Sequence, residues 1–325
     1  MSTKEQILEY LKHHEGYVSG EELSEHLNIS RTAVWKNINN LRNSDYKIDS
    51  ITNRGYKLVY CPDKITSEII SSGLDTKFLA KKVYCYDSID STNEEAKRQA
   101  LHGAPDGSLF IAEKQLGGKG RLGRTWESPS GCGLWFSVLL RKNMLPPQVT
   151  SITLLAGLAV CRTICKMMNC DAMIKWPNDI VIGSKKVCGI LTEMVAEIGR
   201  IEYVVVGIGI NVNNESFPEE ISVKATSLLI ECGHSFVRTD ILKEILKEFE
   251  IVLNQYSENP QLLLEEYKNS CVSLNKTVGF THMDKKMTGK AVDISSNGEL
   301  VIQCDDGKLI PIHSGEVTVQ GVYGQ

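Results

Sequence analysis

The chain has 325 residues and a formal net charge of −4, with 42% apolar and 23% charged residues. These values are typical of soluble globular proteins, so they exclude a wholly disordered chain and a surface that is basic throughout. At about 150 residues per domain, the length predicts two domains or three small ones. Ten cysteines without a CxxC pair, and an N-terminus without an apolar segment, favour a cytoplasmic protein with reduced thiols and no membrane span.

Residues 1–62 are predicted to form a small helical domain with a β-hairpin. Apolar residues recur at helical spacing in three short stretches, and the second and third form a helix-turn-helix over about 20–39. Asn28 suits the end of one helix and Ser30 the start of the next. Two alternating segments flank the turn Asn53-Arg54-Gly55, which predicts a wing.

The charge of this part is asymmetric. Residues 1–29 carry two lysines against six glutamates, whereas residues 30–57 carry six lysines and arginines against two aspartates. Arg and Asn side chains contact base edges in the major groove, and basic residues of a wing neutralise phosphates. A small interaction or dimerisation module is the alternative. We therefore predict DNA binding by residues in and around the third helix and at the wing: Ser30, Arg31, Thr32, Lys36, Asn37, Asn40 and Arg54.

The composition changes at Cys61-Pro62-Asp63, which we interpret as a linker. Residues 63–270 mix predicted strands (82–86, 108–112, 134–140 and 203–206) with longer helices. One helix is expected from about 149 to 168 and is apolar almost all round, which indicates burial. Another is expected after Asp240 as its cap. Residues 271–325 contain short β-like runs divided by Asn297-Gly298 and Asp306-Gly307 turn signals, which predicts a small β-barrel.

Residues 117–126 (GGKGRLGRTW) alternate glycines with cations. Glycine is costly in helices and strands, but exposed backbone N–H groups and arginines can surround an anion. The segment is not a P-loop, because Lys119 is followed by glycine rather than by Ser or Thr. A flexible, solvated linker is the alternative interpretation.

Three further segments place polar residues beside predicted strands. Residues 90–93 (DSTN) lie where a strand gives way to a helix, and simple helix capping is the alternative. Residues 175–179 (KWPND) precede a hairpin whose second strand contains Lys186, for which a solvated lysine is the alternative. Residues 207–211 (GIGIN) lack the third glycine and the helix of a dinucleotide-binding motif. Without HExxH, GxSxG or spaced histidines, no protein metal site is expected.

Taken in this order and at these intervals, the motifs DSTN, Gln115 with the glycine-rich segment, KWPND, 186–190 (KVCGI) and GIGIN resemble biotin protein ligases. The N-terminal winged helix is similar to that of bifunctional members that repress biotin synthesis genes. The resemblance implies an α+β multidomain fold. Its parts would be a winged helix-turn-helix (1–62), a central α/β ligase domain of the class II synthetase-like type (63–270) and an SH3-like β-barrel (271–325).

The resemblance also implies a two-step reaction. Biotin and ATP give biotinyl-5′-AMP and pyrophosphate, and biotin then passes to a lysine of a biotin carboxyl carrier protein of acetyl-CoA carboxylase or another carboxylase. Lys186 and Arg121 would be catalytic, and Mg²⁺ would accompany ATP. The biotin-binding set would be Ser91, Thr92, Asn93, Gln115, Lys119, Gly120, Arg121, Lys186 and Gly189. The ATP-binding set would be Gly118, Arg121, Arg124, Trp126, Lys175, Asp179 and Asn211.

The glycine-rich segment departs from the family pattern at its first arginine, which is Lys119 here, and Leu122 is cationic in some relatives. A lysine keeps the charge but cannot form a bidentate hydrogen bond, so we expect weaker loop ordering or weaker retention of the adenylate.

Biotinyl-5′-AMP would also be the co-repressor, promoting a homodimer through an edge strand near Leu191–Val195 and so placing two recognition helices on operator DNA of biotin genes. Two other functions stay open: a biotin-sensing repressor without ligase activity, and a ligase for another acyl group such as lipoate.

Overall fold

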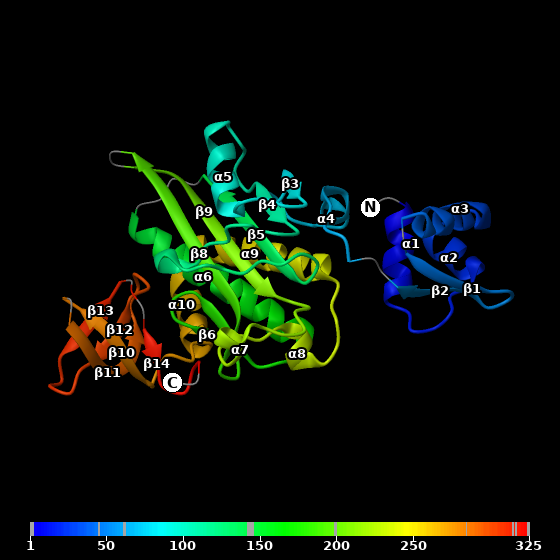
Figure 1. The fold of residues 1–325 in the computed structure, drawn as a ribbon. Helices are drawn as coiled ribbons and strands as arrows, with labels where there is room; N and C mark the ends of the chain where they lie inside the picture. The colour runs from blue at the N-terminus through cyan, green and yellow to red at the C-terminus, as the bar shows by residue number, and fades with distance from the viewer. Residues whose placement is uncertain are drawn as a thin grey trace. The chain divides into compact units, whose positions relative to one another are not determined.

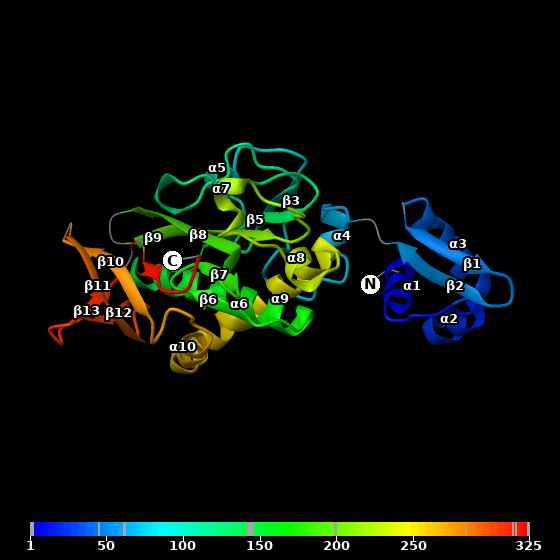
Figure 2. The ribbon, with the colours of Figure 1, turned by 60° about the horizontal axis from the view of Figure 1, so that its bottom comes forward.

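The computed structural model describes residues 3–44, 46–60, 63–141, 146–197, 200–283, 285–313, 315 and 317–323. Packing divides the chain into two compact units, Met1–Leu74 and Asp75–Gln325, drawn as ribbons in Figures 1 and 2. Cys61 and Pro62, which belong to the predicted linker, lie outside the described residues. The domain limits at residues 62 and 270 stay predictions.

The first unit is built on three helices, α1 (Thr3–Lys12), α2 (Gly20–Leu27) and α3 (Arg31–Arg42). Asn28 ends α2 in the left-handed conformation, and the Ser30 hydroxyl accepts a hydrogen bond from the Ala33 N–H at 3.2 Å. These two caps confirm the predicted helix-turn-helix. The core of the unit holds the apolar residues that the periodicity selected: Ile7, Leu11, Leu23, Val34, Ile38 and Leu41, together with Val18.

The predicted hairpin is also present, as the antiparallel strands β1 (Lys47–Ile51) and β2 (Gly55–Tyr60). Gly55 has a φ of +106°, and a Cβ at this position would lie 2.0 Å from the Val18 carbonyl oxygen, so glycine is required at the turn. The short helix α4 (Ser67–Ser71) follows.

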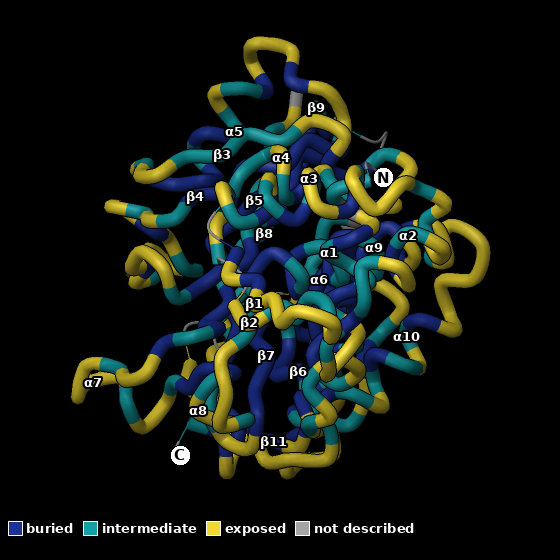
Figure 3. The backbone as a smooth tube through the Cα atoms, turned by 90° about the vertical axis from the view of Figure 1, so that its right-hand side faces the viewer, coloured by how far each residue is buried: buried dark blue, intermediate teal, exposed yellow. Residues whose placement is uncertain are grey.

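The second unit contains a seven-stranded sheet in the order β3-β4-β5-β9-β8-β7-β6. Only β3 and β4 run parallel, and the other neighbours are antiparallel. Every residue of β5 is buried, so polar residues do not alternate with apolar ones along it, and Ser137 is a buried polar residue (Figure 3, buried segments in dark blue). The strands are β3 (Val83–Tyr86), β4 (Leu109–Ala112), β5 (Gly133–Leu140), β6 (Ala172–Lys175), β7 (Asp179–Ile182), β8 (Lys185–Glu197) and β9 (Arg200–Asn211).

The two faces of this sheet are covered by different helices. On one face α5 (Thr92–Leu101) packs Ala96 and Ala100 against residues of β5 and β9 that include Leu139 and Val205. Successive residues of a strand point to opposite faces, so Val206 and its β8 partner Thr192 face the other side of the sheet. On that second face Thr153 of α6 (Pro146–Met168) donates a hydrogen bond to Thr192 of β8, at 2.8 Å between the hydroxyls.

The helix α6 was expected from about 149 to 168 and begins three residues earlier. By length and composition, Val149–Met168 could cross a membrane, but 67% of this window is buried inside the structure. The helix packs against the sheet and against α9 (Arg238–Glu258), so its apolar character is that of a core helix. The remaining helices are α7 (Glu219–Ser222), α8 (Leu228–Cys232) and α10 (Pro260–Asn269).

The predicted cap of α9 at Asp240 is wrong, because the helix begins at Arg238 with Val237 before it. The Arg238 side chain is only 1% exposed, and its guanidinium binds the Glu113 carboxylate at 2.9 Å. A tertiary ion pair therefore fixes the start of this helix, and a local capping pattern does not reveal it.

The end of the chain forms a second, five-stranded antiparallel sheet in the order β13-β12-β11-β10-β14. Gly298 and Gly307 both have a φ of +81°, as the predicted turns require. The strands are β10 (Thr277–His282), β11 (Lys285–Ile294), β12 (Leu300–Gln303), β13 (Leu309–Ile312) and β14 (Thr318–Val319).

A buried carboxylate on α9 holds the beginning of the second unit. Glu250 is 6% exposed and accepts hydrogen bonds from the backbone N–H groups of Lys77, Phe78 and Leu79, the last two at 2.8 and 2.9 Å. Burial raises the pKa of this carboxyl group, but the three N–H donors outweigh it and leave the pKa below its usual value.

We predict that Glu250→Gln lowers the free energy of unfolding by about 1–3 kcal/mol near neutral pH, because backbone donors lose a charged acceptor. The folded pKa is depressed, so this contribution is present above the unfolded value and is lost as the pH falls through the folded pKa. Urea unfolding of both proteins at neutral pH and near pH 3.5 should therefore show the difference shrinking in acid. Glu244→Gln, at a partly exposed side chain paired with Lys247, is the control and should change the free energy of unfolding little. A loss of stability in Glu250→Gln that did not depend on pH would contradict the role given to the Glu250 carboxylate.

Candidate active site

A cavity on the α5 face of the seven-stranded sheet brings together segments that are far apart in the sequence. Its lining comes from the start of α5, the glycine-rich segment, the residues around Asn178, and strands β8 and β9. All nine residues that the resemblance assigns to biotin lie on it: Ser91, Thr92, Asn93, Gln115, Lys119, Gly120, Arg121, Lys186 and Gly189.

The floor of the cavity is a hydrogen-bonded group of small polar side chains. Behind the lining, the buried Ser137 hydroxyl lies 2.7 Å from the Thr92 hydroxyl and donates to the Asn93 side-chain Oδ1 at 2.6 Å. Gln115 accepts from the Thr92 backbone N–H at 2.9 Å and donates to the Ser128 hydroxyl at 2.8 Å. The floor therefore offers both donors and acceptors at fixed positions, as recognition of a small polar ligand requires.

Ser91 is the N-cap residue of α5, but its side chain makes no capping hydrogen bond. The helix therefore starts after Ser91, but helix capping does not account for the Ser91 hydroxyl. Ser91 is 3% exposed and lines the cavity.

The glycines of GIGIN and of β8 allow side chains to lie directly on the sheet. A Cβ on Gly207 would be 2.2 Å from the Asn93 side-chain Oδ1, and one on Gly209 would be 2.5 Å from the Trp126 indole nitrogen. That indole N–H is buried and has no hydrogen-bond partner among the described residues. An acceptor on a bound ligand would satisfy it.

Lys186 forms a compact charged group at one side of the cavity. Its ammonium lies 2.6 Å from Asp179 Oδ1 and 5.0 Å from the centre of the Trp126 ring. The second Asp179 oxygen accepts from the Tyr323 hydroxyl at 2.7 Å. Burial raises the pKa of Asp179, but the charges of Lys186 and Lys175 outweigh it, so the net pKa is lowered and Asp179 is an anion. The solvated-lysine interpretation of Lys186 is therefore wrong.

Tyr323 was not predicted as a site residue. It lies near the end of the chain, 144 residues from Asp179, and no local pattern marks it. Burial and the nearby Asp179 carboxylate raise the pKa of its hydroxyl well above the usual value, so it stays protonated and donates.

The glycine-rich segment is an ordered loop, so the linker interpretation is wrong. The Gly120 N–H donates to the Arg124 carbonyl at 2.7 Å, and the Trp126 N–H donates to the Gly118 carbonyl at 2.9 Å. Arg121 donates from one nitrogen to Asn178 Oδ1 at 3.0 Å and from another to the Gly315 carbonyl at 3.3 Å.

The structure brings together only part of the predicted ATP-binding set. Arg121 and Trp126 line the cavity, Asp179 contacts Lys186, and the Lys175 ammonium lies 5.0 Å from the centre of the Tyr323 ring. Gly118 allows the loop backbone to pass close to the Trp126 carbonyl. Arg124 is exposed, and Asn211 is buried with its amide donating to the Thr226 carbonyl at 3.0 Å. Neither residue lines the cavity.

The cavity lining therefore combines three cations, Lys119, Arg121 and Lys186, with a neutral polar floor. Such a site can hold a ligand with a polar head on the floor and an anionic group at the cations. Fixed cations also stabilise negative charge that develops during a reaction.

In the first unit, most of the residues predicted to bind DNA are exposed on α3 or at the wing. Ser30 caps α3, and Asn37 is half-buried and donates to the Ala33 carbonyl at 2.9 Å. The guanidinium of Arg54 lies 5.5 Å from the centre of the Tyr17 ring. The exposed residues are Ser30, Arg31, Thr32, Lys36, Asn40 and Arg54. Trp35, which was not predicted, is 59% exposed on the same helix.

Comparisons with known proteins find relatives and family models over most of the chain. Three family models match: the biotin/lipoate A/B protein ligase family over residues 85–211, an HTH domain over 3–57 and the biotin protein ligase C-terminal domain over 273–319. The bifunctional ligase/repressor BirA of Bacillus subtilis is 36% identical over 93% of each chain. The BirA of Escherichia coli is 28% identical over 93% of this chain and 92% of its own.

A solved structure of biotin protein ligase from Aquifex aeolicus, in complex with biotin and ATP, has a similar fold. It superposes with a TM-score of 0.64 and 31% sequence identity, covering 74% of this chain and 99% of that one.

We predict that Gly207→Ala disturbs the cavity floor, because its Cβ would push on Asn93, which Ser137 and Glu193 hold at 2.6 and 2.7 Å. Urea unfolding should show a loss of about 1–3 kcal/mol, typical of overpacking. Gly157→Ala is the matched control, since its Cβ would meet atoms no nearer than 3.8 Å within α6. That change should be neutral or slightly stabilising. Equal effects of the two substitutions would contradict the close packing of Gly207 on Asn93.

Proposed function

The chain belongs to the biotin protein ligase family, and we propose that it is an ATP-dependent biotin protein ligase that also represses transcription of biotin synthesis genes. The single observation that carries this proposal is the cavity itself, where the floor around Asn93 meets Lys119, Arg121 and Lys186. The helix-turn-helix of the first unit supports the second role.

In the first step the biotin carboxylate attacks the α-phosphorus of ATP, and pyrophosphate leaves. Two anions must approach each other, so the reaction depends on nearby fixed cations. Lys186 and Arg121 are placed to offset this repulsion, while Ser91, Thr92, Asn93 and Gln115 offer hydrogen bonds to the polar ring of biotin. Trp126, with Arg121, would receive the nucleotide. The loop shields the resulting mixed anhydride from water.

In the second step the ε-amino group of a carrier-protein lysine attacks the acyl carbon of biotinyl-5′-AMP. An amide bond forms, AMP leaves, and the amine loses a proton. The carrier would be the biotin carboxyl carrier protein of acetyl-CoA carboxylase or of another biotin-dependent carboxylase.

Mg²⁺ would enter bound to the phosphates of ATP, whose charge it neutralises. The donors near the cavity do not form a resident metal site, because both Asp179 oxygens already have partners in Lys186 and Tyr323. No group of three potential metal-ligating side chains occurs within the part of the chain that the structure describes.

We further propose the domain limits 1–62, 63–270 and 271–325, a class II synthetase-like type for the central part, an SH3-like barrel for the last, and a cytoplasmic location. The separate five-stranded antiparallel sheet β10–β14 supports the third domain.

The proposed co-repressor is biotinyl-5′-AMP, acting through a homodimer. Strand β8 pairs with β7 only up to Gly189, while its pairing with β9 continues to Glu197. Among the described strands, Leu191–Val195 therefore has a ladder partner on one side only, and an open edge is able to pair with a second copy.

We predict that the full-length protein, mixed with biotin, ATP, Mg²⁺ and an apo carrier domain, labels one carrier lysine and releases pyrophosphate. Lys186→Ala should lower the rate of the first step by about 100-fold or more, because it removes a fixed cation beside the reacting anions. Mass spectrometry of the carrier and a pyrophosphate assay measure the two steps.

The neighbouring Lys185→Ala, which does not line the cavity, serves as the control and should leave both rates unchanged. Normal adenylate synthesis by Lys186→Ala would remove this lysine from the mechanism. A wild-type protein that binds biotin without labelling would be a sensor only, and labelling with lipoate instead would assign another substrate.

For the repressor role we predict that Arg31→Ala weakens binding to duplex DNA from upstream of the biotin synthesis genes by about 1–3 kcal/mol, the effect of losing one base contact. Fluorescence anisotropy with biotinyl-5′-AMP present measures it. Lys12→Ala on α1, outside the predicted DNA-binding set, is the control. Unchanged affinity of the Arg31 variant would place the recognition surface elsewhere.

A further inference from the structure

We propose that Glu94 is a positioning residue that holds the glycine-rich loop over the cavity through an ion pair with Lys119. The inference rests on the proposed ligase function and names a residue outside the cavity lining that the reaction depends on. The ion pair between Glu94 and Lys119 would slow the release of biotinyl-5′-AMP from the cavity.

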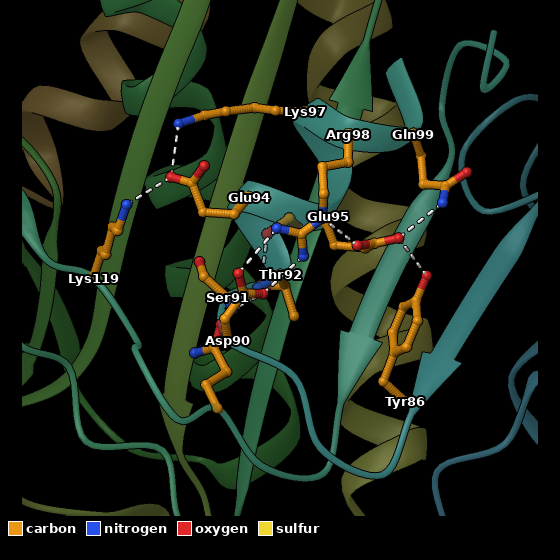
Figure 4. Close-up of polar contacts among 12 residues, drawn as sticks. Tyr86, Asp90, Ser91, Thr92, Glu94, Glu95, Lys97, Arg98, Gln99 and Lys119 are labelled. Carbon is orange, nitrogen blue, oxygen red and sulfur yellow. Dashed lines mark hydrogen bonds and ion pairs between the residues drawn. The ribbon is translucent and has the colours of Figure 1, made fainter. Parts of the chain in front are cut away.

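The contact itself is short and direct. The Lys119 ammonium lies 2.7 Å from Glu94 Oε1, and the two side chains are 53% and 29% exposed. Figure 4 shows Glu94 on the first turn of α5, reached by Lys97 from one side and by Lys119 from the other. Lys119 therefore lines the cavity while its ammonium is held by Glu94, which does not line it.

Glu94 is fixed by more than Lys119. The same oxygen lies 3.1 Å from the Lys97 ammonium, which lies 2.7 Å from Glu193 Oε1. The other oxygen of Glu193 accepts from the Asn93 amide at 2.7 Å. Four alternating charges thus connect the loop to Asn93 on the cavity floor, so Glu94 is held by Lys97 as well as by Lys119.

The surroundings keep Glu94 ionised. The hydrogen bond from Lys119 lowers the pKa of its carboxyl group and outweighs burial, which raises it, and Lys97 adds to the lowering. The first turn of a helix also favours an anion, because unpaired backbone N–H groups point toward it.

Two side-chain contacts of the loop reach different elements. Arg121 binds Asn178 and the Gly315 carbonyl, and Lys119 binds Glu94. An arginine at the Lys119 position could form a two-bond fork, whereas the single ammonium of a lysine depends on one well-placed acceptor. Glu94 is that acceptor, so loop closure over the adenylate depends on it.

The test compares Glu94→Gln, Lys119→Gln and the double variant in the full-length protein. Each variant makes biotinyl-5′-AMP from biotin and ATP, and the release rate of the adenylate is then measured after dilution. We expect release about two- to five-fold faster for each single variant, as for a half-exposed ion pair, and no further increase in the double variant. The rate of adenylate formation should change less than the release rate, and Lys119→Arg, which keeps the charge, should release no faster than the wild type.

Lys247→Gln is the matched control. It breaks a 2.8 Å ion pair with Glu244 on α9, which is also partly exposed but lies away from the cavity lining. It should leave release unchanged. Additive effects of the two single substitutions, or slow release from Glu94→Gln, would overturn the inference. If Glu94→Gln fails to fold, Glu94→Asp, whose shorter side chain keeps the charge but cannot reach the Lys119 ammonium at the same distance, takes its place in the comparison, and slow release from it would overturn the inference. A wild-type protein that forms no adenylate would instead overturn the proposed function.

Discussion

The site depends on one constraint. The side chains of Asn93 and Trp126 lie directly against glycines of β8 and β9, where no Cβ is present. Gly189 pairs directly with Gly209, and Leu191 with Gly207, so neighbouring glycines lie on the α5 face of β8 and β9. Asn93 rests on Gly207 and Trp126 on Gly209 at distances that a Cβ would violate, and a Cβ on Gly189 would lie 2.9 Å from the end of Lys186 and 3.0 Å from Trp126. A pleated sheet normally fills this space with side chains. Their absence creates the cavity and fixes its floor.

The cations around this floor are each positioned by a partner. Asp179 holds Lys186, Asn178 holds Arg121 and Glu94 holds Lys119. These partners come from β7, from the residue before it and from α5. A ligand that adds an anion therefore meets donors whose geometry is already set, so little reorganisation is needed when it binds. The glycines of the sheet thus keep side chains off the cavity floor. Residues at β7 and on α5 supply the partners that position the cations.

Patterns over a few residues of the sequence predicted the helix caps and the buried helix correctly. The caps at Asn28 and Ser30 and the apolar helix near residues 149–168 were predictable, because each depends on neighbouring residues. The residues of the candidate site were predicted through the family resemblance, since they are far apart in the sequence. The start of α9, the role of Tyr323 and the pairing of Glu94 with Lys119 were not. Each depends on a contact between residues 25 to 144 apart, which periodicity and capping rules do not describe.

The network that begins at Lys119 also bears on the proposed repressor role. Glu193, its last charged member, lies within the segment of β8 proposed as the dimer edge, and it binds both Lys97 and the cavity residue Asn93. A ligand that fixes Asn93 and closes the loop therefore acts on both ends of one continuous set of contacts. These charges connect the cavity floor to the segment proposed as the dimer edge by direct contacts. Lys119 therefore lies at one end of a set of contacts whose other end is the segment proposed as the dimer edge.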